Sequence, residues 1–335
     1  MQSLLASVPT SHRSKNMRRR EWLTIAAGAT LVGCTPTDEQ GEVETSPETT
    51  DSLEGRFIDA HVHVWTPDLS SYPISSRFKE SDMRPPSFTP DELFAQCRPA
   101  GVDRINLIQM SFYQDDHRYM LDAMSRYPET FAGTGLLTDV TSADARPSER
   151  MVELADQGLR AFRIVGRSRD AGPAWMEHAN YAALYRSAAE RRLILSFLLN
   201  PPELPEVGRM CMEFPDTPVI IDHLGRVRPG GENAQQDTDA LLALAAHPNV
   251  YIKIGAFYAL SADGPPYFDL LPLIEQVVSA FGPERCMWES DCPYQVQDQH
   301  SYAASVALIR DHAEFLTAEA KRRVLTGTAE ELFFS

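Results

Sequence analysis

The sequence predicts a single (β/α)8 TIM barrel of the α/β class over residues 56–335, and three observations lead to this fold. Eight short apolar runs recur along the chain, and stretches with helical spacing lie between them. Polar side chains follow several of the runs. Continuous apolar runs are typical of parallel strands buried on both faces, and alternation with helices favours crossover connections. Eight strands in one domain favour a closed barrel over a doubly wound sheet.

The predicted elements alternate along the whole of this region. The strand-like runs lie at 57–64, 103–109, 131–137, 159–165, 193–199, 218–222, 250–254 and 285–290, and helical spacing is clear at 90–97, 181–192 and 268–281. Glycines at 225 and 255 follow two of the strands, where we expect them to allow tight turns. The segment from 66 to 89 is rich in proline and is expected to be a loop over the barrel mouth.

Two histidines in the first strand mark a candidate site. His61 and His63 occupy alternate positions of an apolar run, so both imidazoles should leave the same face of the strand. Buried imidazoles are costly to desolvate unless they bind a partner, and a metal ion or a polarised substrate oxygen is a natural one.

Two later strands end in similar polar residues. The sixth strand runs into Asp222 and His223, and the eighth runs into Ser290 and Asp291. In parallel barrels the chemistry collects at the carboxyl ends of the strands. We therefore expect His223 and Asp291 to meet the histidines of the first strand.

Four ordered motifs resemble one known family. DAHVHVW, IDHLGR, FGPERCMWESDCPY and LTGTAEELF are similar to segments of the amidohydrolase-related proteins of the amidohydrolase superfamily. The closest likeness is to the lactonase branch, with its pyrone-dicarboxylate and sugar-acid lactonases. The resemblance implies a hydrolase of a lactone or related cyclic ester, with His61, His63, His223 and Asp291 as catalytic residues.

The residue types suggest how such a site would work. Asp291 is the predicted general base, and the three histidines are predicted to polarise a carbonyl oxygen. His61, His63 and Asp291 could also bind one zinc or manganese ion, which would lower the pKa of a bound water. The family's metal-dependent members usually add a histidine after strand five and sometimes a lysine after strand four, and this chain has neither. Metal-dependent and metal-independent catalysis both stay open.

Substrate binding is predicted for two groups of residues. Arg163, Arg167 and Arg169 follow one another near the end of the fourth strand, and guanidinium groups bind carboxylates well, so we expect a small anionic substrate. Tyr258 and Tyr294 could stack against its ring. Two other functions stay open, namely a metal-dependent decarboxylase or amide hydrolase of the same superfamily, and a non-catalytic barrel that binds a carbohydrate acid.

The first 55 residues concern location rather than chemistry. Residues 1–34 combine paired arginines, a short apolar core and a lipobox-like ending at Cys34, which predicts a twin-arginine export signal and lipidation of that cysteine. The acidic stretch 35–55 reads as a disordered linker. We therefore expect an exported periplasmic or cell-envelope lipoprotein that meets the membrane only through its lipid anchor. The formal net charge of −16 argues against nucleic-acid binding.

Overall fold

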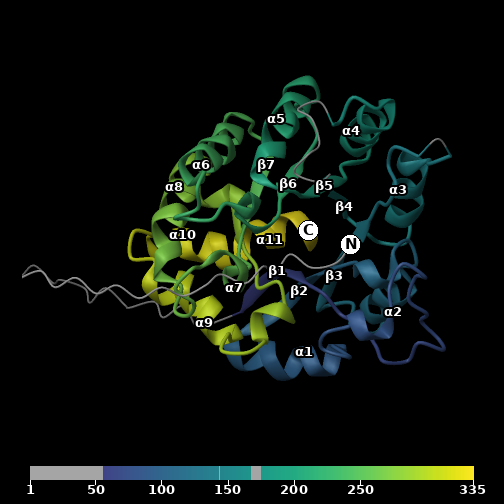
Figure 1. Ribbon diagram of the computed structural model, residues 1–335, viewed down its shortest axis with the longest axis horizontal. Helices are drawn as coiled ribbons and strands as arrows, with labels where there is room; N and C mark the ends of the chain where they lie inside the picture. Colours follow the sequence, from purple (N-terminus) through teal and green to yellow (C-terminus); the bar gives the residue numbers. More distant parts are fainter. Residues whose placement is uncertain (1–55, 143, 167–174) are drawn as a thin grey trace, which may run out of the picture. The chain divides into compact units, whose positions relative to one another are not determined.

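The computed structural model describes residues 56–142, 144–166 and 175–335, and these form the predicted barrel. Eight parallel strands follow one another in the order β1 to β8, each hydrogen-bonded to the next. The ring is nearly closed by residues just beyond β8, because Val62 pairs with Cys292 and the Asp291 amide donates to the His61 carbonyl at 3.0 Å. The helices surround the strands (Figure 1). The predicted (β/α)8 fold is confirmed.

The strands lie close to their predicted positions. They are β1 Phe57–Val62, β2 Val102–Ile108, β3 Phe131–Leu136, β4 Ala161–Val165, β5 Ile194–Leu198, β6 Val219–Ile221, β7 Val250–Ile254 and β8 Cys286–Trp288. Most observed strands are one to three residues shorter than the apolar runs that predict them. At the carboxyl ends of β1, β6 and β8 the difference arises because polar and turn-forming residues follow the last ladder hydrogen bonds, and these residues build the site.

The α-helices follow the strands as expected. They are α1 Pro90–Cys97, α2 Arg118–Arg126, α3 Pro147–Ala155, α4 Ala179–Arg191, α5 Leu204–Glu213, α6 Ala234–Ala243, α7 Phe257–Leu260, α8 Leu271–Phe281, α9 Tyr302–Ala307, α10 Ala318–Arg322 and α11 Thr328–Phe333. Local hydrogen bonds determine where α1 begins. The Thr89 side chain accepts from the Glu92 amide, and the Glu92 carboxylate accepts from the Thr89 amide. This capping box satisfies two otherwise unpaired amides and begins the helix at Pro90.

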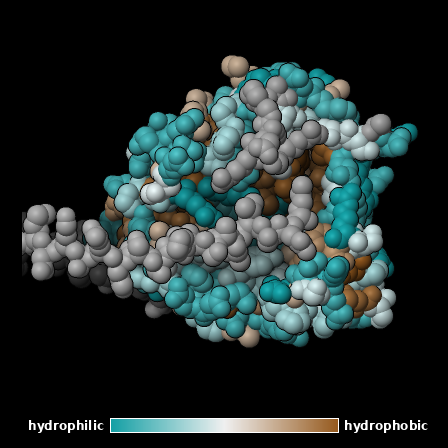
Figure 2. All heavy atoms as spheres, in the orientation of Figure 1, coloured by the Kyte–Doolittle hydropathy of each residue, from teal (hydrophilic) through white to brown (hydrophobic). Residues whose placement is uncertain are grey.

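The amino end of the barrel is filled by apolar side chains. They come from six strands and are Ile58, Ala60, Ala132, Ala161, Ile194, Ile220 and Met287. Ala329 and Phe333 of α11 pack against this layer from below. The space-filling view shows a largely hydrophilic face with hydrophobic residues inside a central hollow (Figure 2). The barrel is therefore a packed core, and only its other end is available for polar chemistry.

The segment between β1 and α1 packs against the loops that leave β2 and β3. The Ser75 amide donates to the Phe112 carbonyl, and Arg77 contacts Asp139 at 2.9 Å. Phe112 follows β2 and Asp139 follows β3, so the segment lies along the carboxyl-end rim, as predicted for residues 66–89.

Two smaller findings concern thiols and membranes. Cys97, Cys211, Cys286 and Cys292 are all buried free cysteines. Across the described ranges, no helix combines the length and the apolar character needed to cross a bilayer. Residues 1–55, which include Cys34 and the predicted signal and linker, lie outside the described residues, as do Arg167 and Arg169.

Candidate active site

Three of the predicted residues converge at the carboxyl end of the barrel. The Nε2 atoms of His61 and His63 lie 3.2 Å apart. Oδ1 of Asp291 lies 3.5 Å from the first of these nitrogens and 3.4 Å from the second. His61 belongs to β1, His63 follows it directly, and Asp291 comes just after β8, so barrel closure brings these side chains together.

Both imidazoles of this triangle are neutral, and that of His63 directs a lone pair inward. Nδ1 of His63 lies 3.0 Å from the Ile108 carbonyl, which can only accept, so this nitrogen carries the proton. Burial lowers the pKa of His63 to about 4, which keeps the ring neutral. The pKa of His61 is also lowered, first by burial and then by the charges of Lys253 and Arg163. Two neutral imidazoles in this arrangement are suited to bind a cation.

The spacing of the triangle fits a metal ion better than direct hydrogen bonds. Two ligand atoms that each lie about 2.0–2.1 Å from a tetrahedral zinc ion are about 3.3 Å apart. The three separations of 3.2, 3.4 and 3.5 Å bracket that value, and the Asp291 contacts are long for hydrogen bonds. The residues His61, His63 and Asp291 therefore fit one divalent metal.

A second set of potential ligands has a different geometry. Glu289 reaches both His61 and His223, with its Oε2 atom 2.9 Å from Nδ1 of His61 and its Oε1 atom 2.7 Å from Nδ1 of His223. These separations are shorter than the spacing of two ligands on a tetrahedral zinc ion and match direct contacts between a carboxylate and an N–H group. Glu289 therefore contacts the two histidine rings directly instead of sharing a metal with them.

His223 stands at the side of the triangle. Its Nε2 atom lies 3.9 Å from Oδ2 of Asp291. Burial opposes a positive charge on this ring, but the Glu289 and Asp291 carboxylates outweigh burial and raise the pKa of His223 above its usual value. His223 begins a run of left-handed residues, with φ 56° at His223 and 60° at Gly225. The glycine meets the expected need for a tight turn at this point.

Asp291 is held in an uncommon backbone conformation. Its φ of 63° is left-handed, a region that aspartate tolerates better than most residues. The Tyr258 hydroxyl donates to Oδ2 of Asp291 at 2.8 Å. Burial raises the pKa of this carboxyl, but the charge of His223 and the neighbouring histidines outweigh burial and hold the pKa well below its usual value. The side chain is therefore a carboxylate at neutral pH.

The structure places Arg163 deeper than the sequence analysis expects. It lies within β4 and is buried, whereas the prediction grouped it with Arg167 and Arg169 at the rim. Its Nε donates to Oδ2 of Asp222 at 3.0 Å, and its Nη2 lies 3.1 Å from Nε2 of His61 and 3.3 Å from Nε2 of His223. The guanidinium thus forms part of the floor of the site.

Sequence analysis assigned no role to three residues beneath the histidines. Lys253 of β7 is fully buried with Nζ 3.0 Å from Oδ1 of Asp222, and the Ser196 hydroxyl of β5 donates to the same oxygen at 3.0 Å. Burial alone would raise the pKa of Asp222, but Lys253 and Arg163 lower it well below the usual value. A lysine in the middle of an apolar strand was the signal available in the sequence.

The two predicted aromatic residues lie beside the catalytic groups. The ring centroid of Tyr294 is 6.2 Å from that of His63 and 6.1 Å from that of Tyr258. Tyr258 contacts Asp291 directly, as described above. Their position agrees with a place at the substrate, and their part in binding stays a prediction. Trp65 and Tyr267 are fully buried and pack in the core.

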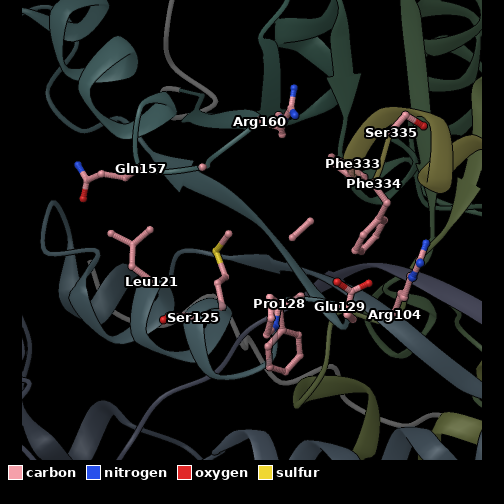
Figure 3. A pocket seen from close by; sticks show the side chains of 14 residues that line it. Arg104, Leu121, Ser125, Pro128, Glu129, Gln157, Arg160, Phe333, Phe334 and Ser335 are labelled. Atoms are coloured by element: carbon pink, nitrogen blue, oxygen red, sulfur yellow. The ribbon is translucent and has the colours of Figure 1, made fainter.

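A hollow at the opposite end of the barrel is unrelated to these groups. It has a volume of about 660 Å³ and lies beside the starts of β2, β3 and β4 and the chain terminus (Figure 3). Arg104, Glu129, Arg160 and Phe334 line it, and none of the predicted site residues does so. The candidate site is the polar cluster at the carboxyl end.

The comparisons with known proteins agree with this fold and show the family. The amidohydrolase family model matches residues 58–334. The L-fucono-1,5-lactonase of Burkholderia ambifaria is 27% identical over 275 residues, which cover 81% of this chain and 93% of that protein. The 4-sulfomuconolactone hydrolase of Hydrogenophaga intermedia is 24% identical over 280 residues, covering 82% and 88%.

A solved structure shows the same fold. An amidohydrolase from Burkholderia multivorans, crystallised with bound zinc, superimposes with a TM-score of 0.68 at 22% identity and covers 82% of this chain and 98% of its own. The matches to curated lactone hydrolases extend over nearly the whole described barrel. The chain therefore belongs to the amidohydrolase family and is an enzyme of its lactonase-like hydrolase type.

Proposed function

We propose that this enzyme opens the ring of a small carboxylated or sugar-acid lactone by hydrolysis. The observation that carries the proposal is the buried triangle of His61, His63 and Asp291, with the Arg163 guanidinium and His223 beside it. A proton acceptor and several hydrogen-bond donors thus face one small volume, which is what attack of water on a carbonyl requires.

Asp291 is the proposed general base. As the oxygen of a water molecule attacks the lactone carbonyl carbon, the carboxylate of Asp291 accepts one proton of that water. Tyr258 donates to the other carboxylate oxygen and so keeps Oδ1 turned toward the two histidines. The low pKa makes Asp291 a weak base, so the proposal requires an attacking water that is more acidic than bulk water.

Two cationic groups at the base of the site stabilise the oxyanion that forms when water attacks the carbonyl. The carbonyl oxygen becomes an oxyanion, and Nη2 of Arg163 and a protonated Nε2 of His223 are the donors within reach of the same volume. The carbon–oxygen bond of the ring then breaks, and the ring oxygen takes a proton to leave as a hydroxyl group. His223 is the proposed donor of that proton, and the product is a hydroxy acid.

A single zinc or manganese ion fits the proposed reaction. His61, His63 and Asp291 would hold it, and it would supply an acidified water and a charge for the carbonyl oxygen. The neutral state of both imidazoles supports this assignment, since metal binding needs their lone pairs.

The proposed substrate class rests on charge and on the relatives. The two curated relatives are named for a sugar lactone and for a sulfonated muconolactone. Arg163 is buried beside the site, and the predicted contribution of Arg167 and Arg169 lies outside the described residues. Tyr258 and Tyr294 are proposed to face the ring of the substrate.

A panel of lactones tests this proposal. Proton release is followed with sugar-acid, muconate-type and simple lactones, before and after treatment with a chelator and after zinc is restored. We expect turnover of a carboxylated or sugar lactone, loss of turnover with the chelator, and recovery with zinc. Decarboxylation or amide hydrolysis without lactone turnover would favour the other superfamily chemistries, and binding without turnover would favour a non-catalytic barrel.

We also propose that the enzyme is an exported lipoprotein. The support is the sequence of residues 1–34, which ends in the lipobox-like Cys34. Incorporation of labelled palmitate into the full chain should disappear in Cys34→Ser. Equal labelling of both proteins would contradict the anchor.

A further inference from the structure

We infer that Glu289 is a positioning residue that fixes the orientation of His61 and His223 together, so that both rings present Nε2 to the reacting groups. The inference rests on the proposed function, because it assigns a role within the same site. Its basis is that one fully buried carboxylate contacts Nδ1 of both rings.

The contact with His223 is a pair of hydrogen bonds. Oε1 of Glu289 lies 2.7 Å from Nδ1 of His223 and accepts from the backbone amide of the same residue at 3.0 Å. A carboxylate oxygen only accepts, so Nδ1 of His223 carries a proton in either charge state of the ring. Both bonds also hold the left-handed start of the loop after β6.

The contact with His61 determines which nitrogen of that ring is free. Oε2 of Glu289 is 2.9 Å from Nδ1, and the Lys253 Nζ atom is 3.3 Å from the same nitrogen. Only the first contact suits a protonated Nδ1. Lys253 already pairs with Asp222 at 3.0 Å, whereas a lone pair on Nδ1 would face a carboxylate oxygen at 2.9 Å and be repelled. Nδ1 of His61 therefore carries the proton, and Nε2 points to His63 and Asp291.

The residue that follows β7 leaves room for the backbone and the Cγ atom of Glu289. A Cβ atom at Gly255 would lie 2.1 Å from the Glu289 carbonyl oxygen and 2.2 Å from its Cγ atom. The chain turns from β7 into α7 within two residues here, but Gly255 has no left-handed φ, so its backbone conformation does not by itself require a glycine. The glycine is required because Glu289 passes so close to it.

Replacement of Glu289 by glutamine should disturb both rings at once. Glutamine has one accepting oxygen and one donating nitrogen, so it cannot accept from two Nδ1 atoms. Loss of such an outer carboxylate typically costs about 10- to 100-fold in metal affinity or activity. Glu206 offers a matched control, since it is also a buried carboxylate but lies on α5 and contacts Arg209.

The test measures the tautomers directly in the full chain. Long-range 1H–15N spectra of protein labelled at its nine histidines should show wild-type His61 with its proton on Nδ1. In Glu289→Gln at least one of the two rings should change tautomer, zinc affinity measured against a chromogenic chelator should fall about 10- to 100-fold, and Glu206→Gln should change neither. Any lactonase activity should lose kcat with little change in KM.

Two results would overturn the inference. One is a wild-type spectrum in which His61 carries its proton on Nε2. This measurement uses the wild-type protein alone, so it does not depend on whether a variant folds. The other is an unchanged pair of tautomers in Glu289→Gln. Neither depends on a substrate, so an enzyme that opens no lactone would contradict the proposed function while leaving the role of Glu289 testable.

Discussion

The two ends of this barrel bury very different side chains. The carboxyl end encloses Asp222, Lys253 and Glu289 without exposure to solvent, next to the histidines. The amino end encloses alanine, isoleucine and methionine side chains beneath Phe333. The difference indicates that the carboxyl end buries interacting charges next to the histidines, while apolar packing stabilises the amino end.

The largest effect should come from Asp291 at the carboxyl end. Asp291→Asn should lower kcat by about 10²–10⁴-fold, because an amide cannot accept the proton of the attacking water. Zinc affinity should fall as well, since a neutral amide replaces a charged ligand. The variant should fold, because asparagine also tolerates the left-handed φ of 63° at this position.

A nearby aspartate supplies the control for this change. Asp298 is also left-handed, with φ 52°, but is exposed. Asp298→Asn should keep wild-type kcat and zinc affinity under the same assay. An Asp291→Asn enzyme with wild-type turnover would remove the general base from the proposal.

The next effect concerns the buried charges beneath the histidines. Lys253→Met preserves the length of the side chain but leaves Asp222 without its closest ammonium partner, and breaking a buried pair destabilises a protein by about 3–5 kcal/mol. Urea unfolding should show this loss. Adding Asp222→Asn should recover part of it, and a single variant as stable as wild type would contradict the buried pair.

A change at the amino end should affect stability without affecting chemistry. Phe333→Ala removes the aromatic side chain that packs under the barrel, and large-to-small changes of this kind cost about 3–5 kcal/mol. We expect the lower end of that range, since 5% of the surface of Phe333 stays exposed to solvent. Thermal unfolding measures the loss, and kcat below the transition should stay at the wild-type value. A large fall in kcat would show that the two ends are coupled.

The sequence predicted the fold well because buried strands have a simple pattern. The runs at 57–64 and 250–254 are apolar and short, and each became a strand within two residues of its predicted end. His61, His63, His223 and Asp291 were predicted to gather because parallel strands bring their carboxyl ends together, and the structure places them within contact of one another.

The partners of these residues could not be predicted in the same way. Lys253 lies within an apolar strand and Glu289 follows one directly, and the sequence pattern alone does not say on which side of the barrel wall their side chains lie. Both residues contact His61, which is far away in the sequence, 192 positions from Lys253. These contacts form only when the barrel closes. Arg163 was placed at the rim because its neighbours are also arginines, but the strand directs it inward.

The smallest effect should come from a surface ion pair at the amino end. Nη1 of Arg104 lies 2.6 Å from Oε1 of Glu330, with 35% and 43% of the two side chains exposed. Ion pairs this exposed contribute about 0.2–1 kcal/mol. Glu330→Gln should therefore lower the free energy of unfolding in urea by no more than that amount. A double-mutant cycle with Arg104→Ala should give a coupling energy in the same range. Arg104 also lies over the Phe334 ring, a contact that Glu330→Gln leaves in place. A coupling of several kcal/mol would mean that the amino end, too, depends on charge, and the contrast with the carboxyl end would then fail.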